Sequence, residues 1–337
     1  MFGFEMNSYD REVYENEIKD FIPDKIIDSH THVYPLYTKK SLDVKYWPDR
    51  VAQDNTVEDI IQTYKDLFPG KEVTPVIFGY PENCYLDKAN EYAVNVSKEY
   101  KYPALFLTDY DMSGEYLEEQ IVKGGFKGLK PYFCNCKPGV NPREAGIYDY
   151  LPHSHLEVAN KFGLTCVLHI SKEERLKNKD NLNTLMEIEQ KYPNVKLIVA
   201  HIGRAYASED IGNAFDVLKN SKNITFDFSA NTLSEAITKC IEAVGTKRVL
   251  FGTDLPIAKM RMKRIVENGY YINVVPRGLY GDVSKAAHMR ETDDISTMTN
   301  FTYEILRAFK KTAKDLTLSK QDVEDIMYLN AKKLYNI

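Results

Sequence analysis

The feature that most constrains the fold is a regular alternation of two sequence patterns between residues 25 and 251. Short apolar runs rich in β-branched residues alternate with segments whose apolar residues recur at helical spacing. This alternation predicts right-handed βαβ units and a parallel sheet. The runs that we interpret as strands are residues 25–32, 73–79, 104–108, 126–132, 164–170, 195–200, 224–228 and 248–251.

Eight such units favour one kind of α/β fold, a single (β/α)8 TIM barrel. A doubly wound open sheet is the alternative, although no Gly-x-Gly-x-x-Gly pattern of a dinucleotide site follows the first strand. We expect residues 1–337 to form one domain, with the barrel core at residues 25–256.

The chain after the last predicted strand is longer than the short connection expected there. Residues 257–300 show no clear periodicity and contain several arginines and tyrosines. Because barrel loops on that face commonly decide the substrate, we expect this insertion to act as a lid over the site or as an oligomer contact. Residues 301–337 should hold the C-terminal helices, at Tyr303–Leu316 and Lys320–Leu334.

Charge and composition exclude several classes of function. The formal net charge of -5 gives no basic field for nucleic acid. No apolar run approaches the ~18 residues that a membrane helix needs, and the N-terminus lacks the pattern of a secretory signal. Five cysteines, an odd number, indicate reduced thiols and a cytoplasmic protein. We therefore expect a small-molecule substrate, with a homodimer as the default assembly.

Two histidines follow each other closely at the end of the first predicted strand. In Asp28-Ser29-His30-Thr31-His32, strand alternation puts residues i and i+2 on one face, so Asp28, His30 and His32 should point the same way. Two imidazoles on one side of a strand end are half of a metal site. A pair of surface histidines is the alternative that this motif alone leaves open.

Further metal-capable side chains stand at the ends of three later strands. His169 ends the fifth predicted strand, His201 ends the sixth, and Asp254 follows the eighth. Each alone is compatible with a hydrogen-bonded core residue or a helix cap. Because the carboxyl ends of all strands of such a barrel meet on one face, the set together with His30 and His32 predicts a metal centre there.

Five motifs follow one another along the chain: Asp28-x-His30-x-His32, Gly128-Leu129-Lys130, Leu168-His169, Ala200-His201-Ile202-Gly203 and Gly252-Thr253-Asp254. In this order, the motifs resemble the amidohydrolase superfamily, and are most similar to its amidohydrolase-2 branch, which includes decarboxylases and lactonases. The resemblance implies that His30, His32, His169 and Asp254 bind one divalent metal ion, with Zn2+ as the first choice and Mn2+ as the alternative. It also implies that His201 transfers a proton beside the metal-bound water, and that Asp254 takes part in catalysis.

Three more residues are candidates for binding the substrate. Lys130 ends the fourth strand, where some members of the wider superfamily carry a carbamylated lysine that bridges two metals; we expect a free ammonium group here. Arg204 follows His201 and would anchor a substrate carboxylate or form a salt bridge at a helix start. Tyr132 lines the site or serves only in packing.

The sequence therefore predicts a metal-dependent hydrolase of a small polar substrate, such as a lactone, ester or amide. In this hypothesis a metal-bound hydroxide attacks the carbonyl and His201 is the general acid/base. Nonoxidative decarboxylation of a small carboxylic acid uses the same residues and is the alternative. A third hypothesis is a non-catalytic binding protein on the same barrel.

Overall fold

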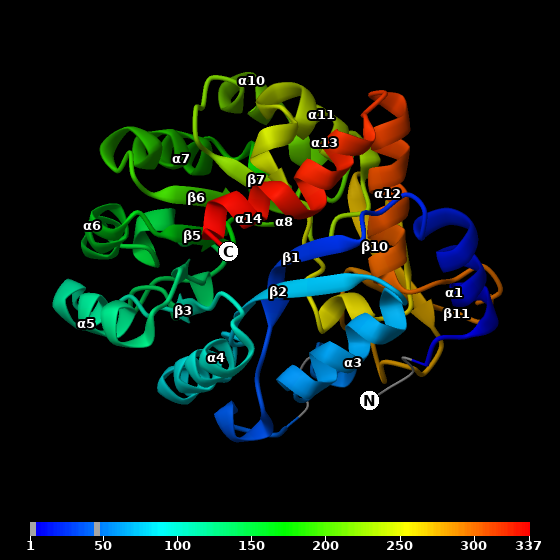
Figure 1. The fold of residues 1–337 in the computed structure, drawn as a ribbon, viewed down its shortest axis with the longest axis horizontal. Helices are drawn as coiled ribbons and strands as arrows, with labels where there is room; N and C mark the ends of the chain where they lie inside the picture. The colour runs from blue at the N-terminus through cyan, green and yellow to red at the C-terminus, as the bar shows by residue number, and fades with distance from the viewer. Residues whose placement is uncertain (1–4, 44–47) are drawn as a thin grey trace.

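The structure, a computed structural model, describes residues 5–43 and 48–337. It is a mixed α/β fold in which every run predicted as a strand overlaps a strand of the structure (Figure 1). The strands are β1 (Lys25–His32), β2 (Glu72–Phe78), β3 (Leu105–Leu107), β4 (Gly128–Lys130), β5 (Thr165–Leu168), β6 (Lys196–Val199), β7 (Thr225–Asp227) and β8 (Val249–Leu250). The longer helices between them are α3 (Val57–Leu67), α4 (Leu86–Tyr100), α5 (Gly114–Gly124), α6 (His153–Phe162), α7 (Lys179–Lys191) and α11 (Ser234–Val244).

All neighbouring pairs among these strands are parallel. β1 pairs with β2, and β3 to β8 form a six-stranded sheet in sequence order. Two isolated parallel bridges join the two sets, Ile77 with Ala104 on one side and Thr31 with Leu255 on the other. The parallel sheet expected from the alternating pattern is thus confirmed.

An apolar cluster collects side chains from six of the strands. Its strand members share complete or nearly complete burial, and α14 (Asn330–Tyr335) adds Ala331 and Tyr335 to them. Figure 1 shows α14 and the C terminus lying beside β1. The strand side chains of this cluster are Ile27, Val76, Phe78, Leu105, Val167, Ile198 and Leu250, and Ala200 directly after β6 joins them.

Helix α3 illustrates how local sequence and packing act together near the site. Thr56 is its N-cap, and the side chains of Thr56 and Asp59 form a reciprocal capping box. The apolar stripe of the helix is buried, and Tyr64 on that stripe donates its hydroxyl to Asp28 at 2.8 Å. The helix therefore supports β1 at the strand end that carries the histidines.

The segment after β8 contains a small sheet that the sequence did not predict. Its strands are β9 (Lys263–Glu267), β10 (Tyr270–Pro276) and β11 (Met289–Thr292), with β10 in the centre. Their side chains are mostly exposed or half-buried, so the apolar pattern that identifies a core strand is weak. The helices that follow, α12 (Phe301–Asp315) and α13 (Lys320–Glu324), overlap the predicted ones.

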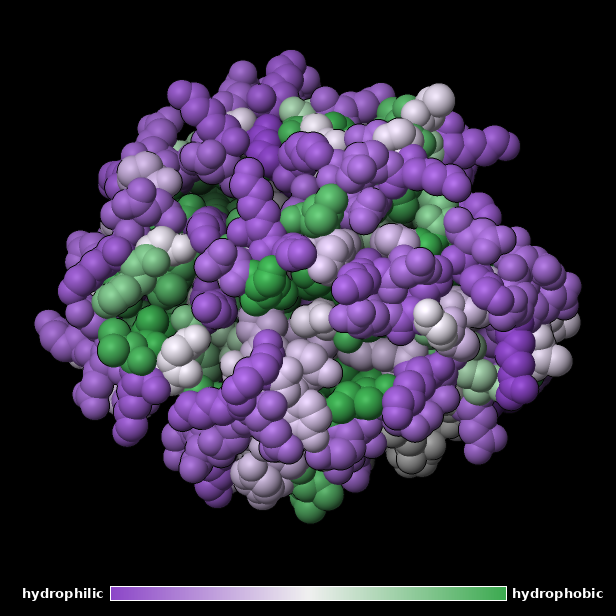
Figure 2. All heavy atoms as spheres, viewed as in Figure 1, coloured by the Kyte–Doolittle hydropathy of each residue, from purple (hydrophilic) through white to green (hydrophobic). Residues whose placement is uncertain are grey.

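The N-terminal helix α1 (Ser8–Val13) is tied to the small sheet's flanking segments through one buried carboxylate. Asp10 forms an ion pair with Arg261 and accepts a hydrogen bond from the Thr299 hydroxyl at 2.7 Å. The face of the molecule seen in Figure 2 is mostly hydrophilic with separate small apolar patches. No helix in the described ranges is long and apolar enough to cross a membrane.

Candidate metal centre

In both histidines of β1, Nδ1 donates a hydrogen bond and Nε2 faces Asp254. His32 donates Nδ1–H to the carbonyl of Gly79 at 3.0 Å, and His30 donates Nδ1–H to Asp227 at 3.1 Å. Their Nε2 atoms both lie near Oδ1 of Asp254, at 3.5 Å for His30 and 3.3 Å for His32. The three potential ligand atoms lie within 4.8 Å of one another, so these residues form one candidate metal-binding group.

The pKa values of His30 and Asp254 suit metal binding. Burial and the nearby Lys130 lower the pKa of His30 to about 3, which keeps its imidazole neutral. Burial opposes ionisation of Asp254, but His201 and the hydrogen bond from His32 hold its pKa below the usual range. A neutral imidazole and an ionised carboxylate are the forms that bind a divalent cation.

Asp227, at the end of β7, is a site residue that the sequence analysis missed. It forms a second candidate group with His30 and His201. Its carboxylate accepts hydrogen bonds from the His30 imidazole, from the backbone N–H of His201 at 2.9 Å and from the backbone N–H of Ser229 at 3.1 Å. Burial disfavours its charge, but the neighbouring His30 and its hydrogen bonds lower the pKa of Asp227. The sequence signal that could have identified Asp227 is its place as a polar residue at the end of a buried apolar run.

His201 lies directly beyond β6 in a strained backbone conformation. Its φ is 57°, and Ile202, Gly203 and Arg204 also have positive φ, a conformation that non-glycine residues adopt at a cost of about 1–3 kcal/mol each. Nδ1–H of His201 donates to the carbonyl of Ser229 at 2.9 Å. Because burial lowers the pKa of His201, the neutral ring has Nε2 available to accept a proton.

His169 lies beside His201 rather than within the His30–His32–Asp254 group. Its ring centroid is 4.9 Å from that of His201 and 4.8 Å from that of Tyr132. Its Nδ1 is buried and has no hydrogen-bond partner among the described residues. A buried nitrogen without a partner is costly, so this orphaned atom is consistent with the metal-ligand role predicted for His169.

Lys130 lies in direct contact with the candidate metal centre. Its Nζ donates to Nε2 of His30 at 3.0 Å and lies 4.5 Å from the centre of the Phe78 ring. The residue is completely buried, and burial lowers its pKa to about 7. The Lys130 amine and a metal ion would therefore use the same lone pair of His30.

Arg204 and Tyr132 also lie next to the histidine cluster. Arg204 donates to the carbonyl of Ile170, next to His169, at 3.4 Å. Of the described carboxylates, none forms an ion pair with Arg204, so a salt bridge at a helix start is not its role here. The ring of Tyr132 lies 5.5 Å from Lys130 Nζ and packs on His169.

Asp28 does not share a face with the histidines, contrary to the prediction from strand alternation. The pairing of β1 with β2 shifts register between Asp28 and Thr31, which breaks the strict alternation. Asp28 instead accepts hydrogen bonds from the Thr253 backbone N–H at 2.8 Å and from Tyr64. It therefore holds the loop that carries Asp254 and is a support rather than a member of the centre.

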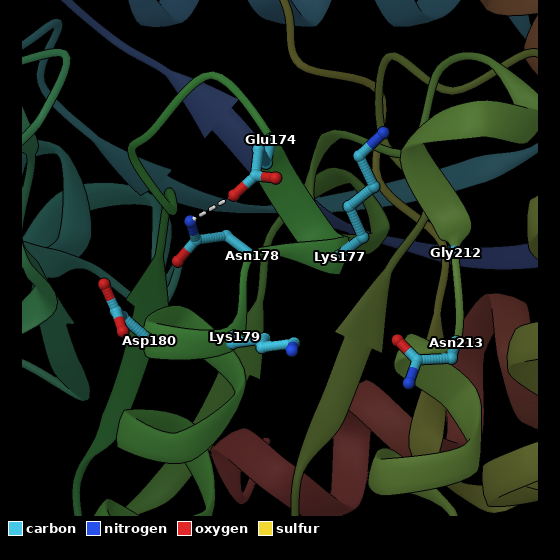
Figure 3. Close-up of a pocket in the computed structure, with 7 residues that line it drawn as sticks. All are labelled: Glu174, Lys177, Asn178, Lys179, Asp180, Gly212 and Asn213. Atoms are coloured by element: carbon cyan, nitrogen blue, oxygen red, sulfur yellow. Dashed lines mark hydrogen bonds between the residues drawn. The ribbon is translucent and has the colours of Figure 1, made fainter.

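A surface cavity of about 310 Å³ lies away from this centre, between the loop after β5 and the loop that precedes α10 (Ala214–Leu218). Figure 3 shows its polar lining, in which Glu174 accepts a hydrogen bond from Asn178 at 2.8 Å. None of the candidate metal-centre residues lines it. Its lining residues are Glu174, Lys177, Asn178, Lys179, Asp180, Gly212 and Asn213.

The donor set fits a divalent metal ion. Structural and catalytic zinc sites use imidazole and carboxylate ligands, and the second ring nitrogen of a ligating histidine usually donates to a carbonyl or carboxylate. His32 with Gly79 and His30 with Asp227 have this arrangement. The residues present therefore suit such an ion.

Residues 27–337 match the sequence profile of the family described as Amidohydrolase (Amidohydro_2). The chain belongs to this amidohydrolase family, as the resemblance of its motifs predicted. Its members are metal-dependent enzymes and include both hydrolases and decarboxylases. Among curated proteins, none matches this chain in sequence.

Three solved structures illustrate the likeness in fold. An amidohydrolase from Burkholderia multivorans with bound HEPES has a TM-score of 0.59 at 11% identity, covering 93% of this chain and 99% of its own. A probable 2-pyrone-4,6-dicarboxylic acid hydrolase from Acinetobacter baumannii has a TM-score of 0.58 at 17% identity, covering 93% and 99%. A 2,6-dihydroxybenzoate decarboxylase from Rhizobium has a TM-score of 0.56 at 14% identity, covering 94% and 99%.

Proposed function

We propose that this protein is a metal-dependent hydrolase of a small polar substrate such as a lactone, ester or amide. The observation that carries the proposal is the convergence of His30 Nε2, His32 Nε2 and Asp254 Oδ1. His169 is proposed as a further ligand of one divalent ion, with Zn2+ as the first choice and Mn2+ as the alternative. When bound, such an ion acts as a Lewis acid and lowers the pKa of water to about 7.

His201 is the proposed general acid/base. Nδ1–H of His201 donates to the carbonyl of Ser229. Burial lowers the pKa of this ring, which favours the neutral form with Nε2 as an acceptor. Nε2 would take the proton of the attacking water and return it to the leaving group. Asp254 is proposed to assist in this proton transfer as well as binding the ion.

The proposal includes a closed (β/α)8 barrel as the scaffold. The two parallel bridges at the edges of the strand sets and the shared apolar cluster support closure. We propose one domain over residues 1–337, with the core at 25–256, the insertion at 257–300 and C-terminal helices at 301–337.

Nonoxidative decarboxylation of a small carboxylic acid is the alternative reaction. The basic groups of Lys130 and Arg204 near the histidines favour it, since they would bind the acid while a proton is delivered to carbon. Tyr132 is proposed to contact the substrate in either reaction. The expected small-molecule substrate, homodimer and cytoplasmic location remain predictions.

The test combines metal analysis with a substrate panel. Protein purified without chelator is expected to contain about one zinc or manganese per chain. Lactones, esters, amides and carboxylic acids would then be scored for acid release and for CO2 release. His201→Asn is expected to lower turnover by about 100-fold or more while the metal content is unchanged. Absence of metal, with no binding on titration, would reject the proposed function.

A further inference from the structure

Arg264, on β9 of the small sheet, reaches from the insertion to the loop that supports His201. Its Nη1 donates to the carbonyl of Ala230 at 2.6 Å, and its Nε donates to Oδ1 of Asn273 at 2.8 Å. Ala230 follows Ser229, whose carbonyl holds the His201 ring. The guanidinium group is therefore positioned at the strand ends that carry the candidate centre.

Aromatic rings surround this guanidinium group. Its central carbon lies 4.5 Å from the ring centre of Tyr206 and 4.9 Å from those of Tyr271 and Phe301. Tyr206 and Tyr271 themselves pack edge to face at 5.0 Å. Cation–π contacts of this kind fix the plane of an arginine, but they do not neutralise its charge.

Arg264 has no ion-pair partner in the part of the chain that the structure describes. Other arginines near the loop and in the same sheet do have one: Arg175 pairs with Asp210 at 2.6 Å, and Arg290 pairs with Glu267 at 2.6 Å. Arg264 is half-buried and bonds only to two neutral oxygens. A partly desolvated cation that lacks a counter-charge is costly unless a ligand supplies the charge.

The donors of Arg264 that no described acceptor uses are sufficient in number to bind a carboxylate. A guanidinium group has five N–H donors, and the protein acceptors engage only Nε and one hydrogen of Nη1. The remaining hydrogens on Nη1 and Nη2 form a fork that can bind both oxygens of one carboxylate. Arg204, also half-buried and without an ion pair among described residues, lies beside His169 and adds a second positive charge.

We propose that Arg264 is a specificity-determining residue that binds a carboxylate of the substrate, remote from the bond that reacts. This inference rests on the proposed function, because it assumes that the substrate reaches the candidate metal centre. It identifies the substrate class as a carbonyl compound that carries an additional carboxylate. It also gives the insertion a direct part in substrate selection.

The test measures binding of succinate, glutarate and adipate, each beside its monoamide, to the metal-loaded full-length protein by titration calorimetry. The monoamide keeps one carboxylate for the metal, so the comparison isolates the second carboxylate. At least one dicarboxylate is expected to bind about tenfold tighter than its monoamide, a difference of about 1.4 kcal/mol. Arg264→Gln should abolish this preference, and Arg264→Lys should retain part of it.

Arg290→Gln is the matched control, because Arg290 belongs to the same small sheet but is already paired with Glu267. It should keep the preference for the dicarboxylate. Thermal unfolding of Arg264→Gln verifies that the variant is folded. If it is not, a reduced preference in the folded Arg264→Lys variant serves as the test. Equal affinities in wild type for all pairs, or an unchanged preference in the Arg264 variants, would overturn the inference.

These outcomes are separable from failure of the proposed function. Turnover of neutral lactones without any preference for dicarboxylates would reject the role of Arg264 and retain the hydrolase. An Arg264-dependent preference in a protein that turns over no member of the substrate panel would reject the hydrolase and retain the carboxylate site.

Discussion

Nδ1 of His30 lies 3.1 Å from Oδ2 of Asp227, and both side chains are completely buried. The carboxylate fixes the tautomer of His30, so that Nε2 rather than Nδ1 is the acceptor nitrogen facing Asp254. Asp227 also accepts from the backbone of His201. One carboxylate therefore orients both a proposed metal ligand and the proposed general acid/base.

Asp227→Asn is expected to weaken metal binding. The amide that replaces the carboxylate supplies no charge to orient the imidazole, and loss of such a partner typically lowers metal affinity about 10–100-fold. Competition with a chromophoric chelator measures the change. Asp216→Asn, at an exposed carboxylate paired with Lys219, is the control and should leave the affinity unchanged. Equal affinity in both variants would show that Asp227 does not position His30.

Gly252→Ala is expected to displace residues of the candidate metal centre, because the added Cβ has no space there. A Cβ at Gly252 would lie 2.9 Å from Cβ of His30 and 3.1 Å from Cβ of Ser229, too close for either to stay in place. We expect a loss of about 1–3 kcal/mol in the free energy of unfolding, together with weaker metal binding. Denaturant titration and metal titration check both effects. Gly146→Ala, whose Cβ would meet only Asp149 at 3.4 Å, should be close to wild type.

Lys259 makes the stability of the protein depend on pH. Burial lowers its pKa to about 8 in the folded state, whereas an unfolded lysine has a pKa of about 10.4. The unfolded state therefore binds more protons between these values, so the cost of burying Lys259 is greatest below pH 8 and disappears as the pH rises toward 10.4.

We define the margin as the unfolding free energy of Lys259→Met minus that of wild type. The margin should be greatest at pH 7 and lower by on the order of 3 kcal/mol above pH 10. The margin should narrow as the pH rises through 8 to 10. Urea unfolding of both proteins across this range provides the measurement, with Lys263→Met at an exposed position as the control. A margin that does not change with pH would exclude titration of Lys259 as its cause.

Lys130 is expected to be an unmodified amine. Its Nζ lies 3.0 Å from Nε2 of His30 and completely within the protein. Native mass spectrometry should give the unmodified chain with one metal ion, and Lys130→Met should still bind that ion. A carbamate on Lys130, two ions per chain, and their loss in Lys130→Met would instead establish a bridging ligand.

Local patterns in the sequence were sufficient to predict much of the fold and to nominate most residues of the candidate site. Burial in a parallel sheet imposes short apolar runs between amphipathic helices, so all eight strands overlap their predicted positions. His30 and His32 were identified because their spacing along one strand is itself the signal. His201 and Asp254 were predicted as site residues because the strand ends of such units converge.

Only the tertiary structure decided which side chains meet across the fold. His30 and Asp227 are 197 positions apart, and no local pattern relates them. The register shift in β1 turned Asp28 toward Thr253, and the position of Arg264 depends on how β9 packs against the loop after β7. Sequence periodicity indicates which face of a helix or strand is buried. The partner of a buried polar group depends instead on how segments that are distant in sequence pack against each other.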